Sequence, residues 1–251
     1  MKLVFSEAGP DYSRYLYPYV VWGIPEPGET PADCLEKGFA LSSPLLDRFV
    51  LCRHIRVNLR QFEPSSENRR ILRKGDPIDT SLLNRTQFEI TPERKSRWRA
   101  FADQRFGKDV MSEARLNRLL DAPVINHLLV FREQSNPREI GTALLYLENK
   151  RAAYYYYAFY ELDQRHRNLG MFMMTQAVQH FADLGFEHLY LGTCYSEQAL
   201  YKTQFPGTEF FNGNAWSTNL EELKYIVRHH PKSQSNHLLD DPAYLEQFKP
   251  S

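Results

Sequence analysis

One stretch of the chain, from Tyr154 to Gly192, constrains the fold more than any other: YYYYAFYELDQRHRNLGMFMMTQAVQHFADLGFEHLYLG. It begins with an aromatic run, which is typical of a β-strand, and continues into a polar, basic turn. Between Met174 and Phe181 the apolar residues recur at the i, i+3, i+4, i+7 spacing of a helix with one buried face. Gly185 marks the end of that helix, and a short apolar strand follows. The stretch therefore predicts a strand, a basic turn, a helix and a second strand, in that order.

The start of this helix is a candidate anion site. Asn168 is a good N-cap residue, the helix begins at Leu169, and Gly170 has no side chain to cover the backbone amides of the first turn. These N–H groups and the helix dipole attract anions, and Arg165 and Arg167 add positive charge. A capped helix that follows a solvated basic turn has the same sequence, so this interpretation remains open from the loop alone.

The rest of the chain divides into three parts: an N-terminal subdomain of short helices and loops over 1–120, a core over 121–230 and a polar tail over 231–251. In the first part, Thr30 followed by Asp33 predicts the cap of a short helix. CRHIRVNLRQF alternates between apolar and polar residues, which predicts a half-buried strand with a basic outer face. In the core, VINHLLVF, EIGTALLYLE and RAAYYYYAFYEL predict an antiparallel meander that runs into the helix described above.

Four segments resemble, in order, the arginyl- and leucyl-tRNA–protein transferases. They are CLEKGF, CRHIRVNLRQFEPSSENRRILRKG, YYYYAFYELDQRHRNLGMF and LYLGTCYSEQALYKTQFPGTEFF, and the resemblance as a whole covers roughly Tyr17 to Trp216. The resemblance implies an α+β fold of the GCN5-related N-acyltransferase type, with a mixed, mostly antiparallel sheet flanked by helices. It also implies an aminoacyltransferase that moves arginine (or leucine) from charged tRNA to the N-terminal amine of a protein. That protein would begin with an acidic residue and would be marked by this N-degron for degradation.

The chain departs from the family pattern at several positions. Of the family's cysteine cluster only Cys52 remains, and Ala40 and Leu41 replace two arginines. A shifted substrate, or a non-catalytic binding relative, therefore remains open. An acetyl-CoA-dependent N-acetyltransferase is a further alternative, because it would share the fold.

Acyl transfer from an ester to an amine needs a neutral amine, a stabilised oxyanion and a proton for the leaving oxygen. Glu161, at the end of the aromatic strand, is the candidate proton relay, and Tyr160 is the second candidate catalytic residue. Tyr157 is expected to flank the substrate. The resemblance aligns Tyr201 and Lys202 with the family, and we expect both to bind substrate, with Lys202 pairing with the acidic acceptor or with a phosphate. Because the ester is already activated, no covalent nucleophile is required.

A local basic cluster supports contacts to nucleic acid, although the formal net charge is +0. Arg53 and Arg56 are expected to contact tRNA phosphates. Arg69 and Arg70 match the family's paired arginines and are expected to hold substrate through a carboxylate or phosphate.

The remaining expectations concern the environment of the protein. Three widely spaced cysteines predict no disulfide framework and no metal site, and aminoacyl-tRNA is the co-substrate, with no separate cofactor. No apolar run approaches the roughly 20 residues of a membrane span, and the first residues do not resemble a signal peptide. We therefore expect a cytoplasmic enzyme without membrane contact, and its oligomeric state is open.

Overall fold

The fold is built on a large mixed sheet. The computed structural model describes residues 1–7, 9–13, 17–75, 77–136, 138–162, 168–229 and 241–248. Within these residues, eight strands form one sheet, and only β9 and β10 among them pair in parallel. In spatial order the strands are β12 (Trp216–Ser217), β11 (Thr208–Phe211), β5 (His54–Asn58), β10 (His188–Thr193), β9 (Ala152–Tyr160), β8 (Glu139–Glu148), β7 (His127–Glu133) and β6 (Ile78–Asn84).

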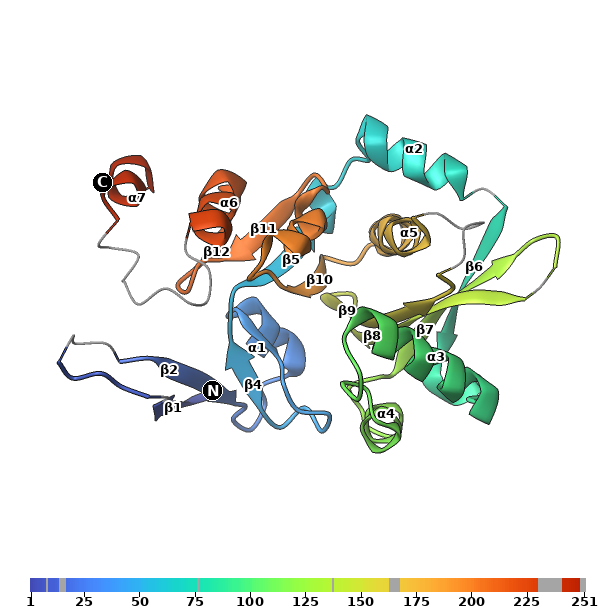
Figure 1. Cartoon of the computed structure of the whole chain (residues 1–251), viewed down its shortest axis with the longest axis horizontal. Coiled ribbons are helices and arrows are strands. Elements are labelled where there is room, and N and C mark those ends of the chain that lie inside the picture. Colours follow the sequence, from blue (N-terminus) through green and yellow to red (C-terminus); the bar gives the residue numbers. More distant parts are fainter. Residues whose placement is uncertain are drawn as a thin grey trace.

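A smaller antiparallel sheet projects to one side of the large one (Figure 1). Its strands, in spatial order, are β1 (Lys2–Glu7), β2 (Tyr19–Ile24), β4 (Phe49–Leu51) and β3 (Phe39–Leu41). The described helices are α1 (Pro31–Glu36), α2 (Ser66–Lys74), α3 (Pro92–Arg105), α4 (Glu113–Leu120), α5 (Leu169–Asp183), α6 (Leu220–His229) and α7 (Pro242–Phe248), with short 3-10 helices η1 (Leu59–Gln61), η2 (Arg85–Gln87) and η4 (Glu197–Thr203).

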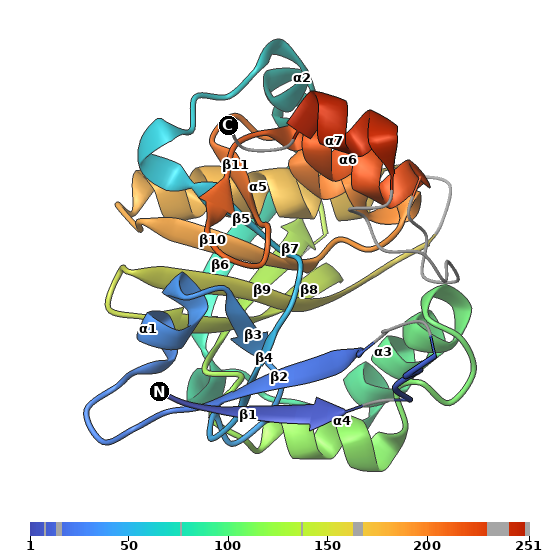
Figure 2. The same ribbon diagram turned by 90° about the vertical axis from the view of Figure 1, so that its left-hand side faces the viewer.

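Helices cover both faces of the large sheet. Figures 1 and 2 place α5 on one face, with α2 beyond it, and α3 with α4 on the other. Each face has its own apolar core: Phe181 of α5 packs with Leu145 on one side, and Trp98 of α3 packs with Phe159 on the other. The predicted meander and the strand–helix–strand order are confirmed, and the layers and mostly antiparallel sheet are those of the expected GCN5-related acyltransferase-like fold.

The large sheet contains strands from both sides of the boundary expected near residue 120. β5 and β6 both belong to the first part of the chain, yet β5 lies between β10 and β11 and β6 forms an edge beside β7. In the expected polar tail, the described residues 241–248 include α7. There, the Tyr244 hydroxyl donates a 2.6 Å hydrogen bond to Glu222 of α6.

The expected basic outer face of β5 is wrong. Arg56 is only 7% exposed, and His54 is completely buried. Arg56 Nε lies 2.6 Å from Glu209 Oε2 of β11, directly across the antiparallel pair, and its guanidinium stacks over the Trp216 ring. Burial also lowers the pKa of His54 to about 3, so this side chain is neutral. Arg56 is therefore held inside the protein and is not positioned to contact a tRNA phosphate.

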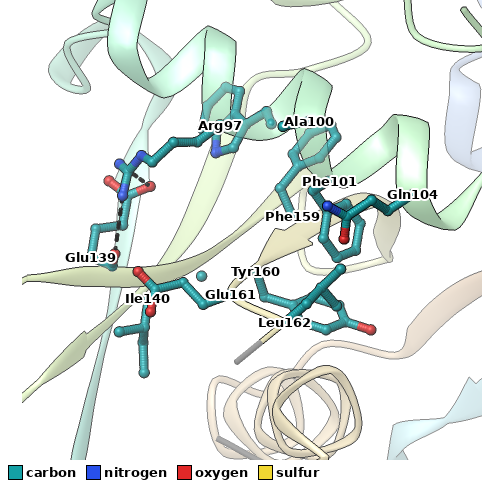
Figure 3. Close-up of a pocket in the computed structure, with 12 residues that line it drawn as sticks. Arg97, Ala100, Phe101, Gln104, Glu139, Ile140, Phe159, Tyr160, Glu161 and Leu162 are labelled. Carbon is teal, nitrogen blue, oxygen red and sulfur yellow. Dashed lines mark hydrogen bonds and ion pairs between the residues drawn. The ribbon is translucent and has the colours of Figure 1, made fainter. Parts of the chain in front are cut away.

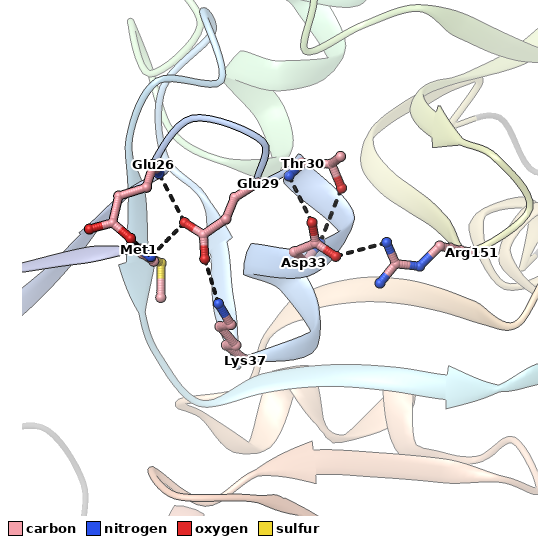
Figure 4. A network of polar contacts seen from close by, with 7 residues as sticks. All are labelled: Met1, Glu26, Glu29, Thr30, Asp33, Lys37 and Arg151. Carbon is pink, nitrogen blue, oxygen red and sulfur yellow. Dashed lines mark hydrogen bonds and ion pairs between the residues drawn. The ribbon is translucent and has the colours of Figure 1, made fainter.

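The short helix α1 begins as predicted. Thr30 and Asp33 form a capping box, in which each side chain accepts a hydrogen bond from the other residue's backbone amide. Asp33 also forms an ion pair with Arg151, from the turn between β8 and β9 (Figure 4). Arg151 Nη1 lies 2.8 Å from Asp33 Oδ1. This ion pair joins the first part of the chain to the core sheet.

Candidate active site

The parallel pair β9–β10 opens into a cavity. Their pairing stops at Tyr154 and Tyr190, although β9 continues to Tyr160 and β10 to Thr193. The pairing of β9 with β8 also shifts at Tyr156, and the Tyr156 and Tyr157 rings pack edge to face, with centroids 5.1 Å apart. A cavity of about 1020 Å³ lies at this opening, between the ends of the strands, the start of α5 and η4. We call it the transfer cavity.

Most of the predicted site residues gather around the transfer cavity. They come from three segments that are distant in the sequence: the end of β9, the first turn of α5 and η4. The residues are Tyr157, Tyr160, Glu161, Asn168, Leu169, Gly170, Tyr201 and Lys202. The structure thus brings the candidate proton relay, the helix start and the candidate lysine to one place.

Asn168 precedes α5 as expected but does not cap it with its side chain. Its φ is 69°, in the left-handed region, and its side chain makes no capping hydrogen bond. The first backbone amides of a helix have no partner within the helix, and here Leu169 and Gly170 line the cavity. The expectation of a side-chain cap by Asn168 is wrong, and the start of α5 faces the cavity in a position that suits an anionic ligand.

Gly170 is needed for a reason that the sequence does not reveal. A Cβ atom at this position would lie 2.5 Å from both Cζ and the hydroxyl oxygen of Tyr160. The glycine therefore lets the Tyr160 ring pack directly against the first turn of α5. The same residue that exposes the helix start also fixes one wall of the cavity.

The two charged candidates are each held by a specific contact. Glu161 Oε2 accepts a 2.9 Å hydrogen bond from Arg138 Nη2, which fixes the carboxylate at the end of β9. Lys202 Nζ donates to the Thr193 carbonyl oxygen at 2.9 Å, at the end of β10. Burial lowers the pKa of Lys202 from its usual value.

A second, smaller pocket adjoins the transfer cavity and shares part of its wall, including Phe101 and Tyr160. Its volume is about 230 Å³. Figure 3 shows α3 above it and the end of β9 beside it. The lining is mostly apolar: Trp98, Ala100, Phe101, Ile140, Gly141, Phe159, Tyr160 and Leu162, with Arg97, Gln104, Glu139 and Glu161 as the charged or amide residues. We call it the apolar pocket.

The carboxylates of the apolar pocket already have partners. Glu139 is buried and pairs with Arg94 at 2.7 Å, while the Thr142 hydroxyl donates to its other oxygen, also at 2.7 Å. Glu161 is held by Arg138. The pocket therefore offers an apolar surface rather than a free negative charge.

Arg53, Arg69 and Arg70 do not line the transfer cavity. Arg69 and Arg70 are exposed on α2, where Arg70 forms an ion pair with Glu67. Arg53 stacks over the Tyr195 ring, 5.0 Å from its centroid. Arg165 and Arg167 lie outside the described residues.

The structure adds residues that the sequence reasoning did not select. Arg105, at the end of α3, and Tyr155, within β9, line the transfer cavity, and Arg115 of α4 donates to the Tyr157 hydroxyl at 3.1 Å. The two arginines belong to helices with many charged residues, so no local pattern distinguishes them. Only the packing of α3 and α4 against the sheet brings them to the site.

The cysteines show no sign of nucleophilic or metal chemistry in the described part of the chain. Burial raises the pKa of Cys52 to about 12 and also raises that of Cys194, which keeps both thiols protonated. Among the described residues, no group of three or more His, Cys, Asp or Glu side chains is arranged to hold a metal ion. Nor is any described helix long and apolar enough to cross a membrane.

Three proteins of similar sequence carry the same name. The chain is 27% identical over 189 residues to an aspartate/glutamate leucyltransferase of Methylobacterium sp. (strain 4-46), covering 69% of this chain and 75% of the relative. It is 25% identical over 208 residues to the enzyme of that name from Dinoroseobacter shibae, covering 75% and 72%. The enzyme of that name from Halorhodospira halophila is 25% identical over 194 residues, covering 72% and 80%. The chain is thus similar to the aspartate/glutamate leucyltransferases. No protein-family model matches it.

These relatives confirm the expectation of an enzyme that acts by acyl transfer, and they support the aminoacyl-tRNA transferase family. They do not support its arginyl member in particular, because the three proteins carry the leucyl name.

Solved structures with a similar fold are more distant. FemX has a TM-score of 0.48 at 11% identity, with 73% of this chain and 66% of that chain covered. L-PGS from Bacillus licheniformis has a TM-score of 0.44 at 11% identity, covering 65% and 51%. A GCN5-related N-acetyltransferase from Sphaerobacter thermophilus has a TM-score of 0.38 at 11% identity, covering 63% and 49%. This chain thus spans about half the length of the last two.

Proposed function

We propose that this protein transfers leucine from charged tRNA to the N-terminal amine of a protein that begins with aspartate or glutamate. The observation that carries the proposal is the transfer cavity, which joins Glu161, the start of α5 and Lys202 in one space. Its connection to an apolar pocket and the names of the relatives support the choice of leucine.

The chemistry requires only groups that line the cavity. The neutral amine of the acceptor attacks the ester carbonyl carbon, a C–N bond forms, and the carbonyl electron pair moves onto oxygen. Collapse of this intermediate breaks the bond between carbon and the tRNA ribose oxygen. The proton that the amine nitrogen loses ends on that ribose oxygen, and Glu161 relays it, held in place by Arg138.

The apolar pocket favours an aliphatic donor side chain over an arginyl one. Its volume of about 230 Å³ is several times the roughly 30 Å³ of a water molecule, which suits a four-carbon side chain. An arginyl group would need a free carboxylate, but Glu139 and Glu161 are already paired. Arg97, which also lines the pocket, would repel a second guanidinium.

Lys202 is the proposed partner of the acidic side chain of the acceptor. We expect Lys202→Met to lower kcat/KM for acceptors that begin with Asp or Glu by roughly 10- to 100-fold, since a hydrogen bond to a charged group contributes about 1.5–3 kcal/mol. Peptides that begin with Ala should react at an unchanged, slow rate. The measurement is the ratio of the two rates in competition. Lys202→Arg, which keeps the charge, should restore much of the preference, and an unchanged ratio in Lys202→Met would contradict the role.

The tRNA phosphates are proposed to bind at the start of α5 and on exposed arginines of α2. The double variant Arg69→Ala with Arg70→Ala should weaken tRNA binding, and the slope of log affinity against log salt should fall by about 2, or about 1 for each lost phosphate contact. Filter binding over a salt series measures this slope. The pair Lys224→Ala with Arg228→Ala on α6 removes the same charge elsewhere and should leave the slope unchanged. Equal slopes for both double variants would exclude α2 from the tRNA surface.

The proposed function is tested by single-turnover transfer. Radiolabelled leucine, and separately arginine, is supplied on tRNA to peptides that begin with Asp, Glu or Ala. We expect transfer of leucine to the acidic peptides. Transfer of arginine alone would overturn the donor assignment. If the folded protein transfers neither amino acid, acetyl-CoA binding by calorimetry decides between an N-acetyltransferase and a non-catalytic relative.

A further inference from the structure

Tyr155 occupies the floor of the transfer cavity. It is 7% exposed and lies on the α5 side of β9, opposite Leu145 of β8. Among the described residues that line this cavity, it is the only polar side chain that is buried. Other polar residues lie nearer the solvent; Tyr201, for example, is 47% exposed.

The Tyr155 hydroxyl has no hydrogen-bond partner among the described residues. Other tyrosines of the same sheet do have one: Tyr146 donates to Glu148 at 2.8 Å, and Tyr157 accepts from Arg115 at 3.1 Å. A buried hydroxyl without a partner destabilises the folded protein, and such groups in native structures call for an explanation. The hydroxyl oxygen is itself closed to solvent, so a ligand that supplies the missing partner must displace the side chains that cover it on the cavity floor.

Tyr155 lines the cavity in which the proposed reaction takes place. It shares this lining with Tyr160 of β9 and Tyr201 of η4. Burial raises the pKa of Tyr155, so the phenol keeps its proton and acts as a donor. Lys202, in contrast, uses one of its three N–H donors on the Thr193 carbonyl and is assigned to the acidic side chain of the acceptor.

We infer that the Tyr155 hydroxyl donates a hydrogen bond to the carbonyl oxygen of the aminoacyl ester. The bond strengthens as that oxygen gains negative charge in the tetrahedral intermediate, and the proton remains on tyrosine throughout. This assignment rests on the proposed function, and it adds a stabilising donor to the relay and binding residues described above. The unpaired hydroxyl lowers the stability of the free protein, but it is available as a donor during transfer.

The test is Tyr155→Phe, which removes one oxygen atom and keeps the ring. We expect kcat for single-turnover transfer to fall on the order of 100-fold, as for other donors to an oxyanion. KM should not change, because the bond acts mainly in the transition state. The ratio of the transfer rate of Tyr155→Phe to that of the unaltered protein should not change with pH, since the phenol does not ionise. The Tm of the empty protein should rise or stay the same, because the lost hydroxyl had no partner.

Tyr146→Phe is the matched control. It also removes a buried hydroxyl from the sheet, but one that is bonded to Glu148. Its Tm should fall and its transfer rate should stay unchanged, the opposite of Tyr155→Phe.

Two kinds of outcome would overturn the assignment. If the unaltered protein is active and Tyr155→Phe turns over at the normal rate, the role of Tyr155 is excluded while the proposed function stands. A lower Tm for Tyr155→Phe would have the same meaning, because it would show that the hydroxyl has a partner within the folded protein. No transfer by the unaltered protein would overturn the proposed function and this assignment together.

Discussion

Replacing Arg56 alone with methionine is expected to cost about 3–5 kcal/mol of folding free energy and to lower Tm by roughly 10 °C. The cause is the partner that remains. Glu209 lies opposite Arg56 in the sheet, its carboxylate is nearly buried, and its 2.6 Å ion pair would be lost. An unpaired buried charge is far less stable than a buried pair. Thermal and urea unfolding followed by circular dichroism would measure the loss.

A second substitution separates the charge from the packing. In Arg56→Met with Glu209→Met no charge is left unpaired, so most of the lost stability should return. Lys224→Met, which breaks an exposed ion pair with Glu221 on α6, should change stability by about 0.5 kcal/mol or less. If Arg56→Met were as stable as the unaltered protein, Arg56 would be free of Glu209 in solution and available to a phosphate after all.

Gly170→Ala should reduce transfer on the order of 100-fold while the fold remains intact. The added Cβ would lie 2.5 Å from the Tyr160 ring, so the end of this side chain must move away from the first turn of α5. Displacements of about 1 Å near a reacting group cost rate on this scale. Alanine stabilises a helix by up to about 1 kcal/mol relative to glycine, so Tm should not fall. Single-turnover kinetics and thermal unfolding on the same sample would test both expectations.

The control for this prediction is Gln176→Ala, in the same helix but away from the transfer cavity. It should leave the transfer rate unchanged. Tyr160→Ala identifies the cause, since its loss should equal that of Gly170→Ala if the displaced ring is responsible. Activity of Gly170→Ala within a few-fold of the unaltered protein would show that the position of Tyr160 does not matter.

Local periodicity predicted the elements around the site, but not their surroundings. The aromatic run, the 3.6-residue spacing and the apolar strand correctly gave β9, α5 and β10. The alternation in β5 was also correct as a strand, but alternation only separates two faces. It cannot show that Glu209 and Trp216, more than 150 positions later in the chain, cover the face of β5 that carries Arg56.

The candidate site shows the same limit. Residues next to the turn, such as Glu161 and Gly170, were predicted because strand end and helix start are adjacent in the sequence. Asn168 was chosen by residue type, yet its side chain does not cap because its φ is 69°. Arg105 reaches the site because α3 packs over the sheet, and Tyr155 because β9 separates from β10 beside it. The local sequence predicts neither arrangement.

The place of β5 in the large sheet has a consequence for how the protein is made. His54 pairs with Thr193, and Arg56 pairs with Glu209, so the two neighbours of β5 leave the ribosome long after β5 itself. Contacts so distant along the chain slow folding, because a long loop must close before they can form. The first 120 residues therefore cannot complete their folding as they are synthesised. The apolar side of β5 must wait for almost the whole chain, which makes the nascent protein dependent on protection from aggregation.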